Sequence, residues 1–280
     1  MRVAVTGASG LIGTRLSAAL RARGDEVTPL KLRDGPPSPA ALAGHDAVVH
    51  LAGEPVAQRW TDAARERIRS SRVDGTRGLV TAVATADPRP RVLVTASGVG
   101  YYGAHGDEHL DEDAAAGDDF LAQVCVATES EAQAAAQAGV RVVVLRTGVV
   151  LDRAGGALAK MLPAFRLGVG GPVAGGDQYL SWIHLDDLVA MYMAAIDDEA
   201  WSGPFNATAP EPVTNAQFSK ALGRALHRPA VLPVPAIALR ALYGQMAEIV
   251  TEGQRAIPRR ALEHGYNFVQ PDLDEALRRS

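Results

Sequence analysis

The chain has 280 residues, of which 47% are hydrophobic and 21% charged, so it can bury the core of one large α/β domain or of a large domain with a small companion. Its formal net charge of −4 gives no reason to expect a nucleic acid or an anionic membrane as a partner. The single cysteine, Cys125, excludes an intrachain disulfide and a cysteine-based metal cluster, and we expect no metal site of another kind. Because we find neither a leader-like nor a membrane-spanning apolar run, we expect a cytoplasmic protein.

Short β-branched runs alternate with longer stretches of helical period in the first half of the chain. This alternation predicts an α/β fold with a Rossmann-type, doubly wound parallel sheet that helices cover on both faces. Gly24 and Gly139 follow two of the predicted helices, where a C-terminal cap favours a left-handed residue. The predicted strands are 2–6, 26–32, 46–52, 91–96 and 140–147, and the predicted helices are 11–23, 61–85 and 120–138.

Three glycines follow the first predicted strand at G-x-x-G-x-x-G spacing, in the stretch VTGASGLIGTRL. At a strand-to-helix turn, glycine adopts positive backbone angles, lets a pyrophosphate approach the main chain, and lets helix and strand pack closely. The N–H groups at the start of the helix then face the phosphates. A tight turn without a ligand is the alternative, but this context favours a dinucleotide site. The predicted cofactor-binding residues here are Gly7, Ser9, Gly10, Leu11, Ile12 and Gly13.

The end of the second predicted strand distinguishes NADP from NAD. An NAD site places a carboxylate about 20 residues after the glycines, and Asp34 lies near that spacing but beyond the strand end. Lys31 and Arg33 lie at the strand end itself, where cations attract a ribose 2′-phosphate. We therefore predict that Lys31 and Arg33 bind NADP, and that NAD is the less favoured cofactor. Solvated surface charges are the alternative interpretation.

The pattern changes after about residue 160, where glycine and proline cluster in 167–176 and proline interrupts 227–242. We divide the chain into residues 1–160, an NADP-binding Rossmann domain, and residues 161–280. The second segment is predicted to form a small C-terminal substrate lobe and to return helices and strands to the main sheet. A terminal helix is expected over 272–279, with an acidic first turn and a basic last turn.

Several stretches make the chain similar to a known family. VTGASGLIG, AVVHLAGEPV (47–56) and TASGVGYYG (95–103) resemble the extended short-chain dehydrogenases/reductases. Stretches 59–80, 145–189 and 256–268 resemble their atypical, epimerase-like subgroup, also labelled nucleotide-sugar epimerase or cell-division-inhibitor-like. The resemblance spans nearly the whole chain and implies a Rossmann-type NADP-binding fold. It implies that Leu51, Ala52, Gly53, Thr95, Arg146, Thr147 and Gly148 contact the cofactor.

One departure from the family concerns the sheet edge. Only a dozen residues, DGPPSPAALAGH, separate Arg33 from Asp46, where the family fits a further strand. Prolines at 36, 37 and 39 make a strand there unfavourable. We therefore predict that the edge strand after residue 33 is shortened or missing.

A second departure concerns catalysis. The family moves a proton with Ser/Thr and a Tyr-x-x-x-Lys pair while the nicotinamide carries the hydride. Ser97, or Thr95, matches the Ser/Thr position, but helix 120–138 contains neither tyrosine nor lysine. The subgroup usually carries a cysteine and a Trp-Glu pair in this helix; Cys125 and Glu129 stand at matching positions, but Thr128 replaces the tryptophan. The standard pair is therefore absent.

Two tyrosines after Ser97 are candidates to replace the missing Tyr-x-x-x-Lys pair, because a phenol there could donate a proton. Without a lysine beside it, the pKa of that phenol would stay at about 10. Packing of a glycine-flanked loop is the alternative. Glu129 or Glu131 could serve as a base if buried. The candidate catalytic residues are Ser97, Tyr101 and Tyr102.

The substrate cleft is expected where the strand carrying HLAGEP ends and where the second lobe meets it. Arginines at 65, 69 and 72 on helix 61–85 are interpreted as a solvated face, with an anionic-substrate clamp as the alternative. His184-x-Asp186-Asp187 resembles a metal triplet, but we interpret it as a helix start capped by one of the aspartates. The predicted substrate-lining residues are Glu54, Arg59, Trp60, Tyr179, Trp182 and His184.

These features predict an NADP-dependent oxidoreductase or epimerase-like enzyme that lacks the Tyr-x-x-x-Lys pair. Its partner is expected to be a small-molecule substrate, with an anionic one as an option, and the protein to be a monomer or homodimer. The alternative is a non-catalytic NADP-binding redox sensor or regulator that kept the fold and lost the pair.

Overall fold

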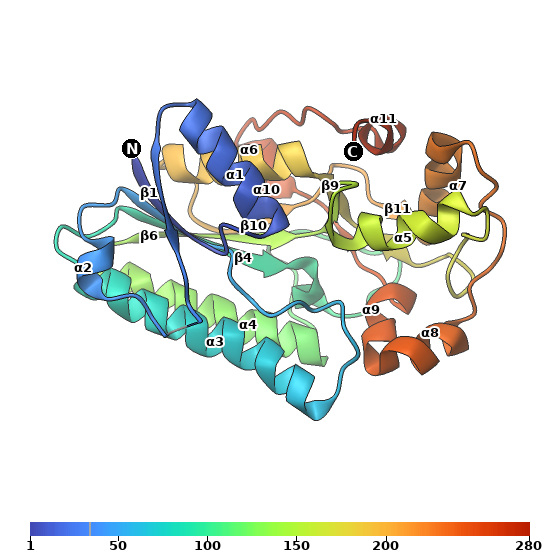
Figure 1. Cartoon of the computed structure of the whole chain (residues 1–280), viewed down its shortest axis with the longest axis horizontal. Coiled ribbons are helices and arrows are strands. Elements are labelled where there is room, and N and C mark those ends of the chain that lie inside the picture. Colours follow the sequence, from blue (N-terminus) through green and yellow to red (C-terminus); the bar gives the residue numbers. More distant parts are fainter. Residues whose placement is uncertain (34) are drawn as a thin grey trace.

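A six-stranded parallel sheet forms the centre of the computed structural model, which describes residues 1–33 and 35–280 (Figure 1). The strand order is β2-β1-β3-β4-β6-β10, and every neighbouring pair is parallel. This confirms the predicted Rossmann-type sheet. Its strands are β1 (Arg2–Thr6), β2 (Glu26–Leu30), β3 (Ala47–His50), β4 (Val92–Gly98), β6 (Arg141–Thr147) and β10 (Gly203–Ala207).

Helices cover both faces of this sheet because its strands are apolar on both sides. On one face, α1 (Leu11–Ala22) and α6 (Leu185–Asp197) pack on side chains such as Val5. On the other face, α3 (Asp62–Thr85) and α4 (Phe120–Gln133) lie side by side (Figure 1). The predicted helix 120–138 is α4 followed by a 3₁₀ turn, Ala134–Ala138. Gly24 and Gly139 adopt positive φ after their helices, as predicted.

The edge of the sheet ends at β2. Among the described residues between Leu30 and Ala47 there is no strand, so the predicted loss of the edge strand is confirmed. The short helix α2 (Pro39–Leu42) replaces it, and Ser38 caps this helix by accepting from the N–H of Ala41. A Cβ on Gly78 of α3 would lie 2.8 Å from Pro36, so the proline segment packs closely against α3.

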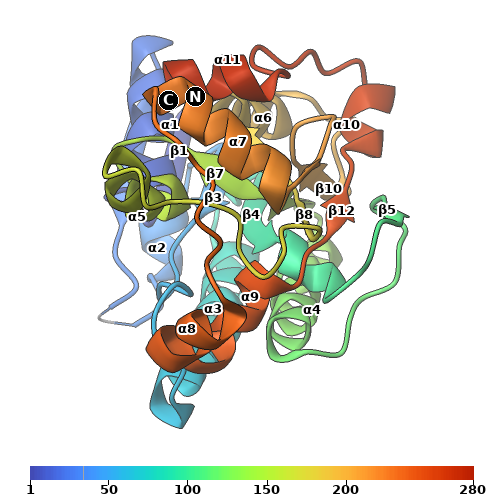
Figure 2. The ribbon, with the colours of Figure 1, turned by 90° about the vertical axis from the view of Figure 1, so that its right-hand side faces the viewer.

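Residues beyond 160 contribute to two places. α6 and β10 belong to the main sheet and its cover. The other helices of this region are α5 (Gly156–Arg166), α7 (Asn215–Leu226), α8 (Ala236–Tyr243), α9 (Glu248–Thr251), α10 (Arg259–Glu263) and α11 (Leu273–Arg279). A smaller apolar cluster around Trp182, Phe218 and Leu277 holds α5, α7 and α11 together. Figure 2 shows these three helices at one end of the molecule. The terminal helix begins at Leu273, with Asp272 as its N-cap.

Short strands also pair with one another outside the main sheet. In the described part of the chain, they form three two-stranded pairs. None of the helices described combines the length and apolarity needed to cross a bilayer. The pairs are β7 (Val149–Leu151) with β9 (Trp182–His184), β8 (Tyr179–Leu180) with β11 (Val213–Thr214), and β5 (His109–Leu110) with β12 (Arg255–Ala256).

Candidate cofactor and catalytic site

The glycine turn connects β1 to α1 and is closely packed. Gly7 has φ +66°, and a Cβ on it would lie 2.8 Å from the N atom of Ala52. A Cβ on Gly13 would lie 2.2 Å from the carbonyl oxygen of Gly7. Neither position can carry a side chain without displacing main chain, so two of the three glycines are fixed by sterics.

The N-terminus of α1 is open. Gly10 is its N-cap and forms no side-chain hydrogen bond, and the first turn contains no acidic residue. The first i→i−4 hydrogen bond of the helix runs from Thr14 N to Gly10 O. The N–H groups of Leu11 and Ile12 precede this bond and therefore have no acceptor within the helix. A diphosphate fits this cradle, because the backbone can be approached closely and unpaired N–H groups with the helix dipole favour an anion.

A buried hydrogen-bond chain fixes the loop that faces this turn. Thr6 Oγ1 accepts from the N–H groups of Leu51 (3.1 Å) and Ala52 (3.2 Å). The hydroxyl proton of Thr6 therefore goes to Nδ1 of His50, 2.7 Å away. His50 is then a neutral imidazole that donates from Nε2 to Thr76 at 3.1 Å. Burial lowers the pKa of His50 to about 4, which keeps the ring neutral at pH 7.

Arg72 lies beside the chain that leaves β3. A Cβ on Gly53 would lie 3.1 Å from Arg72 Cζ, and Arg72 Nη1 donates to the carbonyl of Glu54 at 2.8 Å. Burial lowers the pKa of Arg72. The interpretation of these arginines as a solvated face is therefore wrong for Arg72, whereas Arg69 is exposed.

Two exposed cations stand at the end of β2. Leu30 pairs with Thr6 at the end of β1, so Lys31 and Arg33 leave the sheet on the side of the glycine turn. In the described part of the chain, neither side chain forms an ion pair with a carboxylate. They are available to a phosphate. Asp34, the carboxylate considered for NAD, lies outside the described residues.

A polar triad joins β4, α4 and β6. Ser97 Oγ donates to Glu129 Oε1 at 2.7 Å. Arg146 holds the same carboxylate with two parallel bonds, Nε to Oε1 at 3.0 Å and Nη2 to Oε2 at 2.9 Å. The side chains of Arg146 and Glu129 are only 4% and 13% exposed, so water screens this ion pair little. The Cys125 thiol lies one turn earlier on α4, and burial raises its pKa.

The two tyrosines after Ser97 have different environments. Tyr102 is fully buried, donates to Asn206 Oδ1 at 2.7 Å and accepts from Arg146 Nη1 at 3.1 Å. The hydroxyl proton of Tyr102 is held by Asn206 in the interior and has no path to a substrate, so the prediction that Tyr102 donates a catalytic proton is wrong. Burial also raises the pKa of Tyr102 to about 12. Tyr101 is half-buried, and its ring centroid lies 3.4 Å from Arg146 Cζ. Its ring therefore covers the guanidinium.

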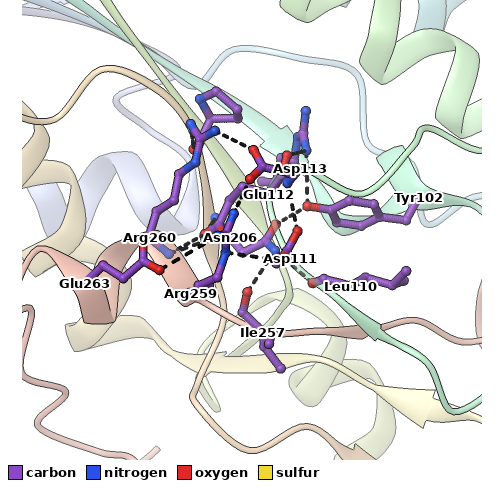
Figure 3. A network of polar contacts seen from close by, with 12 residues as sticks. Tyr102, Leu110, Asp111, Glu112, Asp113, Asn206, Ile257, Arg259, Arg260 and Glu263 are labelled. Atoms are coloured by element: carbon purple, nitrogen blue, oxygen red, sulfur yellow. Dashed lines mark hydrogen bonds and ion pairs between the residues drawn. The ribbon is translucent and has the colours of Figure 1, made fainter.

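A buried carboxylate, which the sequence did not single out, continues this network (Figure 3). Glu112 is 4% exposed, and its carboxylate accepts from the N–H groups of Asn206 (2.9 Å) and Arg260 (3.2 Å). Asp113 forms ion pairs with Arg259 and with Arg260, the latter at 2.7 Å. In the sequence, the adjacent acidic residues at 112 and 113 and the adjacent basic residues at 259 and 260 were the signal that could have indicated this contact. The network ties β5, β10 and α10 to the triad.

The remaining cofactor residues predicted by resemblance lie along the same end of the sheet. Thr95 is fully buried within β4, and its hydroxyl has no partner among the described atoms. Thr147 ends β6, beside Gly98 at the end of β4. A Cβ on Gly148 would lie 2.6 Å from the carbonyl oxygen of Ser181, so this position also requires glycine.

The comparisons with known proteins agree with this geometry. The model of the NAD-dependent epimerase/dehydratase family matches residues 3–207, and a domain of unknown function, DUF1731, matches residues 234–280. An epimerase family protein of Mycobacterium bovis is 44% identical over 98% of this chain and 96% of its own. The chain belongs to the NAD-dependent epimerase/dehydratase family. The predicted atypical subgroup is confirmed, since a bovine epimerase family protein, SDR39U1, is 40% identical over 99% of both chains.

Two solved structures illustrate how closely this chain resembles its relatives. Human epimerase family protein SDR39U1, crystallised with NADPH, has a TM-score of 0.90 at 38% identity and covers 100% of this chain and 98% of its own. A nucleoside-diphosphate sugar epimerase of Corynebacterium glutamicum has a TM-score of 0.80 at 36% identity, covering 99% of this chain and 57% of its own.

The predicted substrate-lining residues of this epimerase-family chain divide into two groups, and the first is at least partly accessible. Trp60 stacks edge-on against Phe120 at 5.1 Å, and Arg59 donates to the carbonyl of Ala241 at 2.8 Å. Tyr179 lies under the guanidinium of Arg255, 4.6 Å from its ring centroid. The Glu54 carboxylate accepts from the side-chain amide of Gln58 at 3.0 Å. These side chains can still meet a ligand.

Trp182 and His184 form the second group and are packing residues. Trp182 is 1% exposed in the smaller apolar cluster and donates to the carbonyl of Glu211, so its predicted place in the cleft is wrong. His184 is 4% exposed and caps α6, its Nδ1 accepting from the N–H of Asp186 at 3.2 Å. The prediction that an aspartate caps this helix is therefore also wrong. Asp187 accepts instead from the backbone at 269 and 270.

Proposed function

We propose that the chain is an NADP-dependent oxidoreductase or epimerase-like enzyme whose glycine turn holds the cofactor's diphosphate. The observation that carries the proposal is the packing of Gly7 and Gly13, which leaves the N-terminus of α1 uncapped and free of side chains. The human relative crystallised with NADPH supports the same cofactor. When bound, NADP(H) would supply or accept a hydride at its nicotinamide.

The choice of NADP over NAD depends on Lys31 and Arg33. In the proposal, both cations bind the ribose 2′-phosphate. Replacing both by glutamate is expected to weaken NADPH binding by at least about 100-fold, since each charge-assisted hydrogen bond contributes roughly 1.5–3 kcal/mol. Titration calorimetry with NADPH and with NADH measures this, and Arg21→Glu, at an exposed position of α1, is the matched control. Equal losses for NADPH and NADH would contradict the assignment.

The acid–base role is assigned to Ser97 and Glu129. Ser97 Oγ takes a proton from a substrate hydroxyl as it passes its own proton to Glu129, and the reverse transfer serves a carbonyl substrate. Arg146 holds the carboxylate, and Tyr101 covers the guanidinium of Arg146. Glu129→Gln keeps the shape of the site but cannot accept the proton.

Turnover and cofactor affinity separate this role from a structural one. On a panel of carbonyl compounds and nucleotide sugars, Glu129→Gln is expected to lower kcat about 100-fold or more, with an unchanged Kd for NADPH. Glu131→Gln is the control, because Glu131 lies two residues away and pairs with exposed Arg77. Full activity of Glu129→Gln would remove Glu129 from the mechanism.

A small anionic substrate is favoured by two arginines held on aromatic rings. Arg65 Cζ lies 5.0 Å from the ring centroid of Phe120 and 5.7 Å from that of Trp60. Arg255 lies on Tyr179, and its Nη1 donates to the carbonyl of Asp107 at 3.2 Å. Stacked guanidinium groups retain donors for a carboxylate or phosphate.

A non-catalytic NADPH-binding regulator is the second candidate, favoured by the absence of tyrosine and lysine from residues 120–138, where the family carries its Tyr-x-x-x-Lys pair. It predicts tight NADPH binding with no turnover on the same panel. If Ser97→Ala abolishes a detected turnover while NADPH still binds, the enzyme is supported and the regulator is excluded.

A further inference from the structure

The charges of the chain are segregated. Residues 154–176 and 212–247 contain six lysines and arginines and no aspartate or glutamate, so the remainder of this chain of net charge −4 carries −10. α5, α7 and α8 belong to these segments and lie toward the right-hand end of the molecule in Figure 1, with α8 below the other two. The modest overall charge therefore conceals a cationic end.

The two segments meet along a shared surface. Arg228 Nε donates to the carbonyl of Arg166 at 3.1 Å, and Val234 N donates to the carbonyl of Pro172 at 2.8 Å. Between these contacts, a Cβ on Gly171 would lie 2.1 Å from the carbonyl oxygen of Leu232. The loop after α5 thus runs directly beside the loop between α7 and α8.

Aliphatic side chains project from both loops. Leu167 is 78% exposed and Val231 73%, and Val169 and Leu232 are also exposed. We call these four residues the aliphatic ridge. Large aliphatic side chains gathered at this exposure on adjacent loops indicate a contact surface, because isolated ones need no explanation but clusters do.

Cations border the aliphatic ridge. Lys220, His227 and Arg228 surround an open hollow of about 510 Å³ that Val231 also lines, and Arg166 directly precedes Leu167. Arg224 pairs with Asp274 of α11 at 2.7 Å. Within the described residues, no carboxylate forms an ion pair with Lys220, Arg166 or Arg228. Their charges remain available to an external anion.

We propose that this end of the molecule docks on an anionic lipid surface, with the aliphatic ridge entering the headgroup–acyl boundary and the cations meeting the lipid phosphates. The inference differs from the one drawn from net charge alone, because it depends on where the charges lie. A two-fold dimer through this surface would place like charges face to face. A nucleic acid would leave the aliphatic side chains without a partner. The aliphatic ridge projects outward from loops. This shape favours insertion into a bilayer over the binding of an acidic protein, which would need a groove.

Co-sedimentation of the full chain with vesicles tests the proposal. Binding is expected to vesicles of phosphatidylcholine mixed with phosphatidylglycerol, to weaken with salt, and to be absent with phosphatidylcholine alone. Lys220→Ala with Arg166→Ala, whose side chains form no ion pair in the structure described, is expected to lower the partition coefficient about 30-fold, equivalent to about 1 kcal/mol per side chain. Leu167→Ser with Val231→Ser is expected to weaken binding similarly.

Matched controls change the same chemistry elsewhere. Arg21→Ala with Arg91→Ala removes two exposed cations from the opposite region, and Leu262→Ser with Val269→Ser removes two exposed aliphatic side chains. Both control proteins are expected to bind as the wild type does. The proposal is overturned if the wild type does not bind anionic vesicles at low salt, a result that would favour an acidic protein as the partner of this surface. It is also overturned if the control variants and the variants of the aliphatic ridge lose binding equally.

Discussion

At the scale of single residues, His50 has a defined pH response. Its pKa is lowered to about 4 by burial, with a smaller contribution from the charge of Arg72, against an ordinary value near 6.5. Because the folded state binds the proton less tightly, the stability contributed by neutral His50 is present above pH 6.5. It is lost as the pH falls toward 4.

We therefore expect the free energy of unfolding to fall by about 2 kcal/mol between pH 7 and pH 5 through this residue. Urea denaturation at both values measures it. His50→Asn keeps an acceptor for Thr6 but cannot take up the proton, so the difference between wild type and variant isolates the effect. A variant with the same pH slope as the wild type would show that His50 is not the source.

Residue-scale predictions from sequence failed where burial decided the outcome. Tyr101 and Tyr102 are adjacent and chemically identical, yet one covers Arg146 and the other is fully buried against Asn206. The contact of Ser97 with Glu129 joins positions 32 residues apart, so no local pattern contains it. The glycine turn could be predicted because its chemistry lies within seven consecutive residues.

At the scale of elements, strands with several β-branched residues were predictable and β10 was not. β1 and β6 read as apolar runs, whereas β10, GPFNA, contains glycine, proline and asparagine around one buried Phe205. It is a strand because it pairs with β6 along its whole length, which is a tertiary effect. The missing edge strand was predictable because three prolines cannot supply a hydrogen-bond ladder.

Two glycine-to-alanine substitutions separate helix propensity from site packing. A Cβ on Gly75, within α3, would have no neighbouring atom within 4 Å, so Gly75→Ala is expected to stabilise the fold by about 1 kcal/mol. Gly13→Ala places its Cβ 2.2 Å from a carbonyl oxygen and is expected to destabilise the fold and to abolish NADPH binding. Thermal denaturation and NADPH titration measure both. An NADPH affinity unchanged in Gly13→Ala would contradict the assigned cradle.

The element α10 is held by the buried carboxylate of Glu112, and burial raises the pKa of that group. The stability this raised pKa contributes is complete below the ordinary value near 4.3 and is lost as the pH rises through the folded value. Glu112→Gln retains an acceptor for Asn206 and Arg260 without the charge. The stability of Glu112→Gln relative to the wild type is therefore expected to improve as the pH rises, whereas Glu112→Ala, which also lacks the acceptor, is expected to be about 1–3 kcal/mol less stable than Glu112→Gln at every pH. Urea denaturation from pH 4 to pH 8 distinguishes the two.

At the scale of the whole molecule, the proposed cofactor site at the β1–α1 turn would link ligand binding to folding. A ligand that binds only the folded state adds roughly 2.7 kcal/mol of stability at a concentration one hundred times its Kd. For a chain of this length, that increment raises the Tm by several degrees. We expect NADPH to raise the Tm of the wild type in this way. Lys31→Glu with Arg33→Glu should retain the unliganded Tm, because both side chains are exposed. At the nucleotide concentrations used for the wild type, the variant should lose most of the shift with NADPH but not the shift with NADH. A shift by neither nucleotide in the wild type would contradict the cofactor assignment while leaving the fold and the lipid-binding proposal unaffected, since these rest on other residues.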